Sequence, residues 1–273
     1  MIFKLDRDTI VPPFTSKVSR LVVLKMLNRA GFKDLVEEIE RPWRTKPYVF
    51  SVLFEGGRPL YKTGRDRGGP LSLRASREYS FEATVIGDLN ALKVVRALSE
   101  VGEVEAFNGR VSLLHIEAET KGFEELGAKV PVGHVKMEFL TPALLQLPLP
   151  ERLRGKIKAR HVLFPLPSLI VYSLARHWNL FAPEGEKIIN EGPLSARSNF
   201  ILMEVDYNIR PTTAVYDERR RPRGITGWVL YKLNPVGRKY VDTLLKLLDY
   251  SNYVGVGRSR TAGFGLTRTS FQA

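Results

Sequence analysis

The order in which helical and strand-like apolar spacing alternate along the chain constrains its fold more than any other feature. In the first half, the apolar residues repeat in the order strand, helix, strand, strand, helix, strand. This is the order of a split β-α-β unit, in which helices pack on one face of an antiparallel sheet. The segments are 2–5, 16–30, 48–54, 79–86 and 88–100, with a closing pair of strands at 104–107 and 111–118.

The second half repeats this order with insertions, which predicts an α+β protein of two ferredoxin-like (RRM-like) domains. A polar, glycine-containing stretch at 120–130 joins them, and we place the boundary so that the domains are 1–125 and 126–273. The helix at 88–100 is expected to turn Leu89, Leu92, Val95 and either Ala97 or Leu98 inward. The segments of the second half are 134–140, 167–181, 200–209, 228–233, 237–250 and 266–271.

The charge is strongly basic and unevenly distributed. Of 273 residues, 42 are lysine or arginine and 29 are acidic, which gives a net charge of +13. Residues 1–125 hold 20 basic and 18 acidic side chains, whereas residues 126–273 hold 22 and 11. An excess of this size is typical of proteins that bind nucleic acid or an anionic surface, and it predicts a polyanion mainly on the second half.

Composition also excludes several classes of protein. With 44% hydrophobic residues the chain has enough apolar surface for a core, so a disordered or fibrous protein is excluded. It has no cysteine, hence no disulfide, thiolate metal site or thiol nucleophile, and it shows neither a secretory signal nor an apolar membrane span. The four histidines have no metal-ligand spacing. We therefore expect a cytoplasmic protein with no metal, no cofactor and no membrane.

The sharpest local motif is GVGRSRTAGFG at 255–265. Four glycines with arginines between them can bring bare backbone N–H groups to an anion, so a cradle for phosphate is one interpretation. A tight turn and bulge into the last strand is the other. A dinucleotide fingerprint is excluded because position 260 is arginine and no helix has room to follow, and a P-loop is excluded because no glycine-lysine pair follows.

In this context the motif resembles the RAMP superfamily, and within it the CRISPR-associated endoribonucleases that cut repeat transcripts into guide RNAs. HVKMEFLTP at 134–142 and RPRGITGWVLYKL at 221–233 carry the likeness in the second half. PPFTSKVSRLV at 12–22 and TKP at 45–47 carry it in the first half. The pattern is that of crenarchaeal members. The resemblance implies RNA bound between two ferredoxin-like domains.

The resemblance also implies a reaction and its residues. A metal-independent endoribonuclease would let a 2′-hydroxyl attack the adjacent phosphate, leaving a 2′,3′-cyclic phosphate and a 5′-hydroxyl. Many members place a histidine near the first helix, but this chain has none before position 115. Matching motifs, Lys17 or Lys46 would transfer a proton or stabilise the leaving group. Arg20, Arg223 and Arg260 would hold the transition-state charge.

Basic clusters and the glycine loop are the predicted RNA-binding residues. For each basic residue, the alternative is a solvated surface charge without a binding role. Trp43, between two arginines, could stack on a base or fasten a loop to the core. The RNA-binding residues are Arg152, Arg154, Lys156, Lys158 and Arg160; Arg219, Arg220 and Arg221; and Gly255, Gly257, Arg258, Gly263 and Gly265.

The expected partner is CRISPR repeat RNA, with other subunits of an interference complex or a second copy of the chain left open. Two other functions stay open as well. The chain could be a non-catalytic RAMP subunit that holds guide RNA, or an RNA-binding protein whose charge serves ribosomal or transfer RNA.

Overall fold

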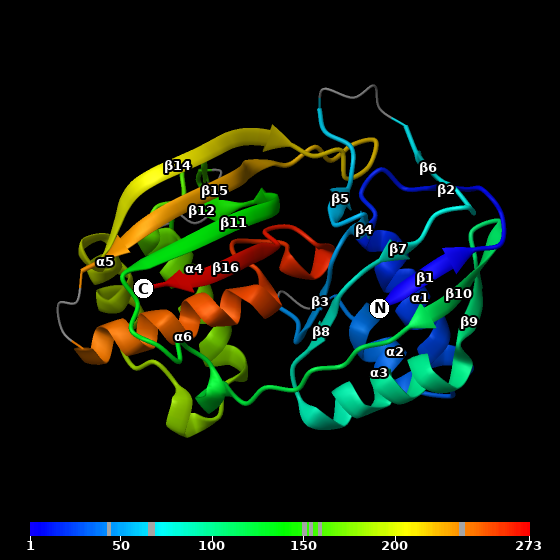
Figure 1. Cartoon of the computed structure of the whole chain (residues 1–273), viewed down its shortest axis with the longest axis horizontal. Coiled ribbons are helices and arrows are strands. Elements are labelled where there is room, and N and C mark those ends of the chain that lie inside the picture. The colour runs from blue at the N-terminus through cyan, green and yellow to red at the C-terminus, as the bar shows by residue number, and fades with distance from the viewer. Residues whose placement is uncertain (43–44, 65–68, 149–151, 153–154, 158–159, 235–237) are drawn as a thin grey trace. The chain divides into compact units, whose positions relative to one another are not determined.

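The computed structural model describes the chain except for residues 43–44, 65–68, 149–151, 153–154, 158–159 and 235–237 (Figure 1). The chain forms two compact units. The first consists of Met1–Thr120, Ala214–Pro222 and Thr261–Gly263, and the second of Lys121–Thr213, Arg223–Arg260 and Phe264–Ala273. Two short segments from late in the sequence thus belong to the first unit, and the main division lies a few residues before the boundary predicted at 125/126.

The first unit has the predicted ferredoxin-like plan with additional strands at its edges. Its main sheet has the order β5-β4-β7-β1-β10-β9, with β1 between β7 and β10 in antiparallel pairings. The elements are β1 Ile2–Leu5, β2 Thr9–Val11, α1 Ser16–Arg29, α2 Lys33–Glu40, β3 Tyr48–Phe50, β4 Leu53–Glu55, β5 Arg58–Leu60, β6 Leu71–Leu73, β7 Tyr79–Ser80, β8 Ala83–Val85, α3 Asp88–Val101, β9 Glu103–Ala106 and β10 Gly109–His115.

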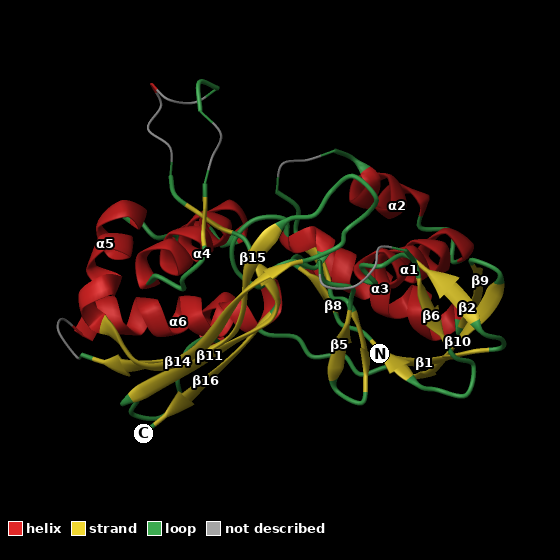
Figure 2. Cartoon of the chain, turned by 90° about the horizontal axis from the view of Figure 1, so that it is seen from above, coloured by secondary structure: helices red, strands yellow, loops and turns green. Residues whose placement is uncertain are grey.

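The second unit repeats the plan with a four-stranded sheet of order β14-β15-β11-β16. Helices α4, α5 and α6 cover one face of this sheet (Figure 2). The elements are η1 Phe123–Glu125, β11 His134–Ala143, β12 Leu145–Gln146, β13 His161–Val162, α4 Pro167–Phe181, η3 Glu184–Glu186, α5 Glu191–Ile201, β14 Leu202–Thr213, β15 Arg223–Leu233, α6 Arg238–Val254 and β16 Thr267–Gln272. The tandem ferredoxin-like fold predicted from the sequence is confirmed.

The core of the first unit fixes helix α1, which carries two of the predicted site residues. Val22, Met26 and Leu27 project from one side of the helix at helical spacing and are fully buried. They pack in one cluster with Phe3 of β1 and Ala97 of α3. Because a fully buried aliphatic side chain contributes about 1.5–3 kcal/mol, this face holds the helix firmly against the sheet.

Helix α3 corrects one expectation. Leu89 and Leu92 are 69% and 67% exposed and Val95 is exposed as well, whereas Val94 is buried. Ala97 and Leu98 are buried, as expected for one or the other of them. The sequence offers two apolar stripes on this helix, and periodicity alone does not say which one faces the sheet.

Several elements differ in extent or type from the prediction. The segment expected to be one strand at 79–86 forms two strands, β7 and β8, in different sheets, and β11 and β15 are longer than predicted. The segment expected to be one strand at 48–54 is broken into β3 and β4, where Ser51 bonds through both its main chain and its hydroxyl to Glu82. Phe200, expected to begin a strand, lies near the end of α5 and is 76% exposed. Among the described residues, no helix combines the length and apolar character that crossing a membrane requires.

Candidate functional site

The N-terminus of α1 is held by contacts to segments distant in sequence. The Thr15 hydroxyl donates to the main-chain oxygen of Leu60 at 2.5 Å and accepts the N–H of Leu53 at 2.8 Å. The Ser16 hydroxyl donates to the main-chain oxygen of Ala262 at 2.7 Å. Residue 17 therefore follows two anchored residues, and Ala262, in the short segment Thr261–Gly263 of the first unit, lies beside the start of the helix.

Lys17 is held by the 214–222 connection, the segment Ala214–Pro222 that joins β14 to β15 and belongs to the first unit. Its Nζ donates to the main-chain oxygen of Tyr216 at 3.0 Å and lies 4.3 Å from the centre of the Tyr216 ring. The Arg220 guanidinium lies 4.6 Å from the same ring centre. Phe14 contacts the ring as well, with the two ring centres 5.6 Å apart. Two cations therefore share one aromatic ring.

Arg20 and Lys46 meet at the C-terminal end of α2. Nη2 of Arg20 and Nζ of Lys46 both donate to the main-chain oxygen of Ile39, at 3.3 and 2.5 Å. A carbonyl in the last turn of a helix carries partial negative charge, which favours cations there. The Nε of Arg20 is buried and has no hydrogen-bond partner among the described residues.

Burial and neighbouring charges change the proton affinity of the two lysines. Partial burial lowers the pKa of Lys17, which Arg220 lowers further and Asp217 raises. Partial burial also lowers the pKa of Lys46, with Arg20 lowering it further and Glu40 raising it. A lysine with a depressed pKa can exchange a proton nearer neutral pH, whereas arginine stays charged and can only stabilise an anion. We refer to Lys17, Arg20 and Lys46 together as the cluster. Its two lysines are suited to proton exchange, and its arginine is suited to stabilising an anion.

The glycine motif makes a packed turn, the alternative that the sequence left open. The N–H groups of Gly255, Gly257 and Gly265 donate to the Ser251 oxygen, the Ser173 hydroxyl and the Pro142 oxygen. These three N–H groups are engaged inside the protein, so they do not form the anion cradle. All four glycines of the motif have positive φ and lie against neighbouring atoms where a Cβ would collide.

Arg260, which the sequence motifs predicted to hold transition-state charge, is buried. Its side chain is 7% exposed, and its Nη2 donates to the main-chain oxygen of Ser173 at 2.7 Å and to the hydroxyl of the same residue. Its Nε and Nη1 are buried with no hydrogen-bond partner in the described part of the chain. Burial lowers its pKa to about 10. The guanidinium therefore ties the glycine motif to α4 instead of meeting solvent.

Comparison with known protein families assigns both halves of the chain. A model described as the Cas6 N-terminal domain matches residues 2–121. A second model, described as CRISPR-associated endoribonuclease Cas6, matches residues 137–267. The chain belongs to the Cas6 family of CRISPR-associated endoribonucleases. The family resemblance drawn from the sequence motifs is confirmed.

The Cas6 relatives match the chain over nearly its whole length. Two curated proteins of Saccharolobus solfataricus are CRISPR-associated endoribonucleases Cas6 2 and Cas6 1, each 25% identical to the chain. The first alignment covers 100% of the chain and 97% of the relative, and the second covers 99% and 97%.

Solved Cas6 structures share the fold. A Thermus thermophilus Cas6 in a product complex aligns with a TM-score of 0.72 at 20% identity, covering 98% of both chains. A second Cas6, in a complex with a substrate mimic, aligns with a TM-score of 0.61 at 17% identity, covering 99% of this chain and 100% of the other.

The predicted catalytic residues of this Cas6 chain fall into two groups. Lys17, Arg20 and Lys46 lie in the first unit, where Arg20 contributes to the electrostatic surroundings of both Lys46 and Tyr216. Arg223 begins β15 in the second unit with an exposed side chain, directly after the 214–222 connection. Arg260 is buried in the second unit.

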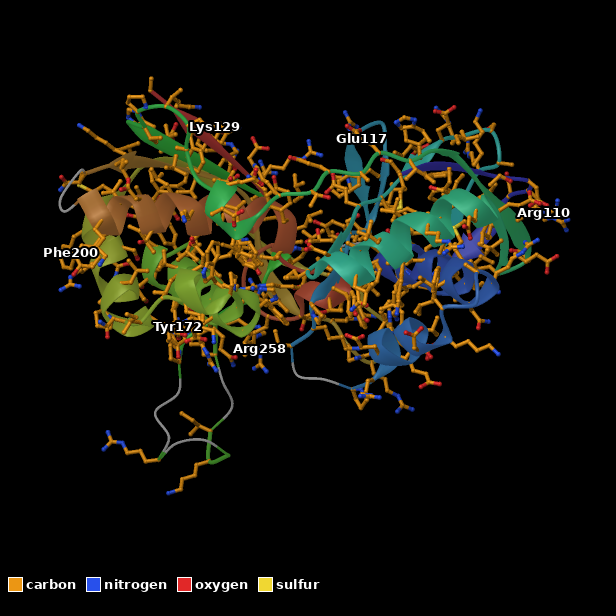
Figure 3. All side chains as sticks on the ribbon, turned by 90° about the horizontal axis from the view of Figure 1, so that it is seen from below. Arg110, Glu117, Lys129, Tyr172, Phe200 and Arg258 are labelled. Carbon is orange, nitrogen blue, oxygen red and sulfur yellow. The ribbon has the colours of Figure 1, made fainter. Side chains whose placement is uncertain are left out.

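Most predicted RNA-binding side chains in the described part are exposed. Arg258 is exposed, and Nη1 donates to Gln146 Oε1 at 2.5 Å (Figure 3). Arg154 and Lys158 lie outside the described residues, as does Trp43. The exposed ones are Arg152, Lys156, Arg160, Arg219, Arg220, Arg221 and Arg258.

Tyr216 and Asp217 are site residues that the sequence did not single out. Asp217 Oδ2 pairs with Nη2 of Arg220 at 2.5 Å, and Oδ1 accepts the N–H groups of Arg219 and Arg220. These bonds close the turn that presents Tyr216. The available signal was an aromatic residue and an acid directly before a run of arginines, but nothing local points to Lys17, which lies 199 residues away.

Within the described residues, no three or more His, Asp or Glu side chains are grouped so as to hold a metal ion.

Proposed function

We propose that this chain cleaves CRISPR repeat RNA into guide RNAs without a metal ion. The observation that carries the proposal is the arrangement of three cationic side chains in one unit of a Cas6-family chain. Lys17 and Arg20 lie one turn apart on α1, Arg20 and Lys46 share the main-chain oxygen of Ile39, and the pKa of both lysines is lowered. The cluster combines groups that can exchange protons with a group that stays cationic.

The chemistry is a transesterification at one phosphate. The 2′-hydroxyl loses its proton and attacks the adjacent phosphorus, and the bond from phosphorus to the 5′-oxygen breaks. The departing 5′-oxygen takes up a proton, so the products are a 2′,3′-cyclic phosphate and a 5′-hydroxyl. Lys17 or Lys46 serves the proton transfer or the leaving group, and Arg20 and Arg223 stabilise the charge on the transition state.

Exposed arginines and lysines would bind the rest of the RNA. The preferred candidates are the basic residues between β12 and β13 and those at 219–221, because both sets lie in the more basic half of the sequence. Two solved Cas6 neighbours, one in a product complex and the other in a substrate-mimic complex, support the binding of a substrate by this fold.

Cleavage of end-labelled repeat RNA in EDTA tests the proposal. We expect one cut, with a product that carries a cyclic phosphate, and no cut when the nucleotide 5′ of the scissile phosphate is replaced by its 2′-deoxy form. A cut that requires magnesium, or one that persists with the deoxy substrate, would overturn the mechanism.

A second function is favoured by one observation, the absence of histidine before His115. Without that proton carrier, the chain could bind guide RNA as a non-catalytic RAMP subunit. Tight, repeat-specific binding with intact RNA after long incubation at high temperature would support this function over the first. Equal affinity for unrelated RNAs at matched salt would instead indicate an RNA-binding protein without repeat specificity.

A further inference from the structure

The ammonium of Lys17 is confined by one residue from a different part of the sequence. Tyr216 contacts it twice, through the main-chain oxygen at 3.0 Å and through the ring, whose centre lies 4.3 Å from Nζ. A lysine on a flexible four-carbon stem has considerable rotamer freedom, and two contacts to one rigid residue remove much of it.

Tyr216 is itself fixed from several sides. Its N–H donates to the main-chain oxygen of Arg220 at 3.1 Å, and its ring contacts Phe14, which lies three residues before Lys17. The neighbouring Val215 donates its N–H to the main-chain oxygen of Lys62 at 2.9 Å. The position of the ring is thus set by the first unit's own structure.

We propose that Tyr216 is a positioning residue for the cleavage reaction, which holds the Lys17 ammonium in place. The inference rests on the proposed function for its effect on rate, and on geometry alone for its effect on Lys17. The charged groups that face Lys17 are Asp217 and Arg220 from the same connection, and Arg20 lies one turn further along α1.

We also expect the ring to influence the proton affinity of Lys17. Burial is the largest cause of the lowered pKa of Lys17, and the Tyr216 ring provides part of that cover. Removing the ring should admit water to the ammonium and raise the pKa of Lys17 toward the ordinary value for lysine. Loss of the contact with the ring's π face acts in the opposite direction but is the smaller effect at a partly exposed site.

The decisive rate experiment is a double-mutant cycle under single-turnover conditions. Tyr216→Ala should slow cleavage about tenfold with RNA affinity little changed, because a small displacement of a catalytic group costs up to about a hundredfold. Tyr216→Phe, which keeps the ring, should cleave within about twofold of the unmodified protein. In a Lys17→Ala background, Tyr216→Ala should have no further effect. An equal loss in both backgrounds would show that Tyr216 does not act through Lys17.

Two additional measurements separate this inference from folding defects and from the proposed function. Tyr240→Ala removes a ring that lies 4.4 Å from the Arg197 guanidinium outside the site, and it should leave the cleavage rate unchanged. If Tyr216→Ala does not fold, Tyr216→Leu keeps apolar packing against Phe14 and replaces it in the cycle.

Titration of isotopically labelled lysine by NMR, with the Lys17 signal assigned through Lys17→Arg, reports on Lys17 directly. The pKa of Lys17 should rise in Tyr216→Ala and stay unchanged in Tyr240→Ala. An unchanged pKa in Tyr216→Ala would overturn the inference. Since this readout needs no RNA, it decides the question even if the unmodified protein fails to cut repeat RNA, an outcome that would refute only the proposed function.

Discussion

Arg20 and Lys46 donate to the same main-chain oxygen, that of Ile39, from the first helix and from the segment before β3. The two positive charges around this acceptor repel each other. The Arg20 guanidinium therefore disfavours the charged form of Lys46 and is one cause of its lowered pKa. Lys17 lies under the influence of a different arginine, Arg220. Each candidate proton carrier is therefore coupled to its own arginine, which gives a way to tell them apart.

The first prediction uses this pairing to identify the proton carrier. Arg20→Gln removes a charge that lowers the pKa of Lys46, so that pKa should rise. If Lys46 carries the proton, the corresponding limb of the pH–rate profile moves to higher pH. Arg220→Gln should do the same for Lys17. Single-turnover profiles of both variants measure the effect.

Each outcome of that comparison has a distinct meaning. A shift only in Arg20→Gln assigns the proton to Lys46, and a shift only in Arg220→Gln assigns it to Lys17. If neither profile moves while both rates fall, neither lysine titrates in the reaction and both act by charge alone.

The second prediction concerns Gly263, whose φ of 81° lies in the left-handed region. A Cβ at this position would lie 2.7 Å from Cβ of Ser16 and 3.0 Å from the main-chain oxygen of Phe50. Gly263→Ala should therefore lower the free energy of unfolding by about 2 kcal/mol and slow cleavage, because Ser16 precedes Lys17. Urea unfolding and single-turnover rates measure the two effects.

The control for that variant is another glycine. A methyl group added at Gly185 would meet no atom within 4 Å, and Gly185 has no positive φ, so Gly185→Ala should change stability by less than about 0.5 kcal/mol. Equal effects of the two substitutions would contradict the packing argument at Gly263.

The apolar periodicity was sufficient for the fold class, because most helices and the strands at the centre of each sheet bury one face. The edge strand β14 is an exception, since only Leu202 of its residues is buried. The periodicity could not choose between the two apolar stripes of α3, where Leu89 is exposed and Val94 is buried. It also missed α2, which buries only Leu35 and Ile39 and follows α1 after a short turn. Apolar periodicity indicates that an element is amphipathic, but tertiary packing decides which of its faces is buried.

Sequence motifs named three residues of the cluster, Lys17, Arg20 and Lys46, but only through family resemblance. The contact between Lys17 and Tyr216 joins positions 199 residues apart, and no local pattern encodes it. The burial of Arg260 was not expected for a related reason. An arginine among glycines suggests a solvated loop, whereas the turn folds inward and buries the side chain against α4.

The third prediction concerns that burial. Arg260 carries a buried charge whose Nε and Nη1 have no hydrogen-bond partner among the described residues, and burial lowers its pKa to about 10. Arg260→Met removes the buried charge and leaves Ser173 bonded to the N–H of Gly257. The free energy of unfolding should stay the same or rise by about 1 kcal/mol.

Thermal unfolding and cleavage rate together test this prediction. Arg258→Met, at an exposed position, is the matched control and should change stability by less than about 0.5 kcal/mol. A stable Arg260→Met protein that has lost cleavage would show that the guanidinium does reach the RNA, as the sequence motifs suggested.

The fourth prediction concerns the basic residues between β12 and β13. Arg152, Lys156 and Arg160 are exposed, and the two-stranded pairing of Leu145–Gln146 with His161–Val162 brackets their segment. If each contacts one phosphate, replacing all three by alanine should reduce the slope of log K against log salt by about 2, because each phosphate contact to single-stranded RNA contributes about 0.7. Affinity at low salt should fall. At high salt, the affinities of the triple variant and of the unmodified protein should become similar.

A matched triple variant separates local contacts from net charge. Lys33, Lys129 and Lys239 are exposed and were not predicted to bind RNA, and replacing them removes the same charge. Since long-range attraction depends on net charge and contact-dependent counterion release depends on position, the control should lower affinity modestly and leave the slope nearly unchanged. Equal slopes for the two triple variants would place the RNA elsewhere than on the segment between β12 and β13.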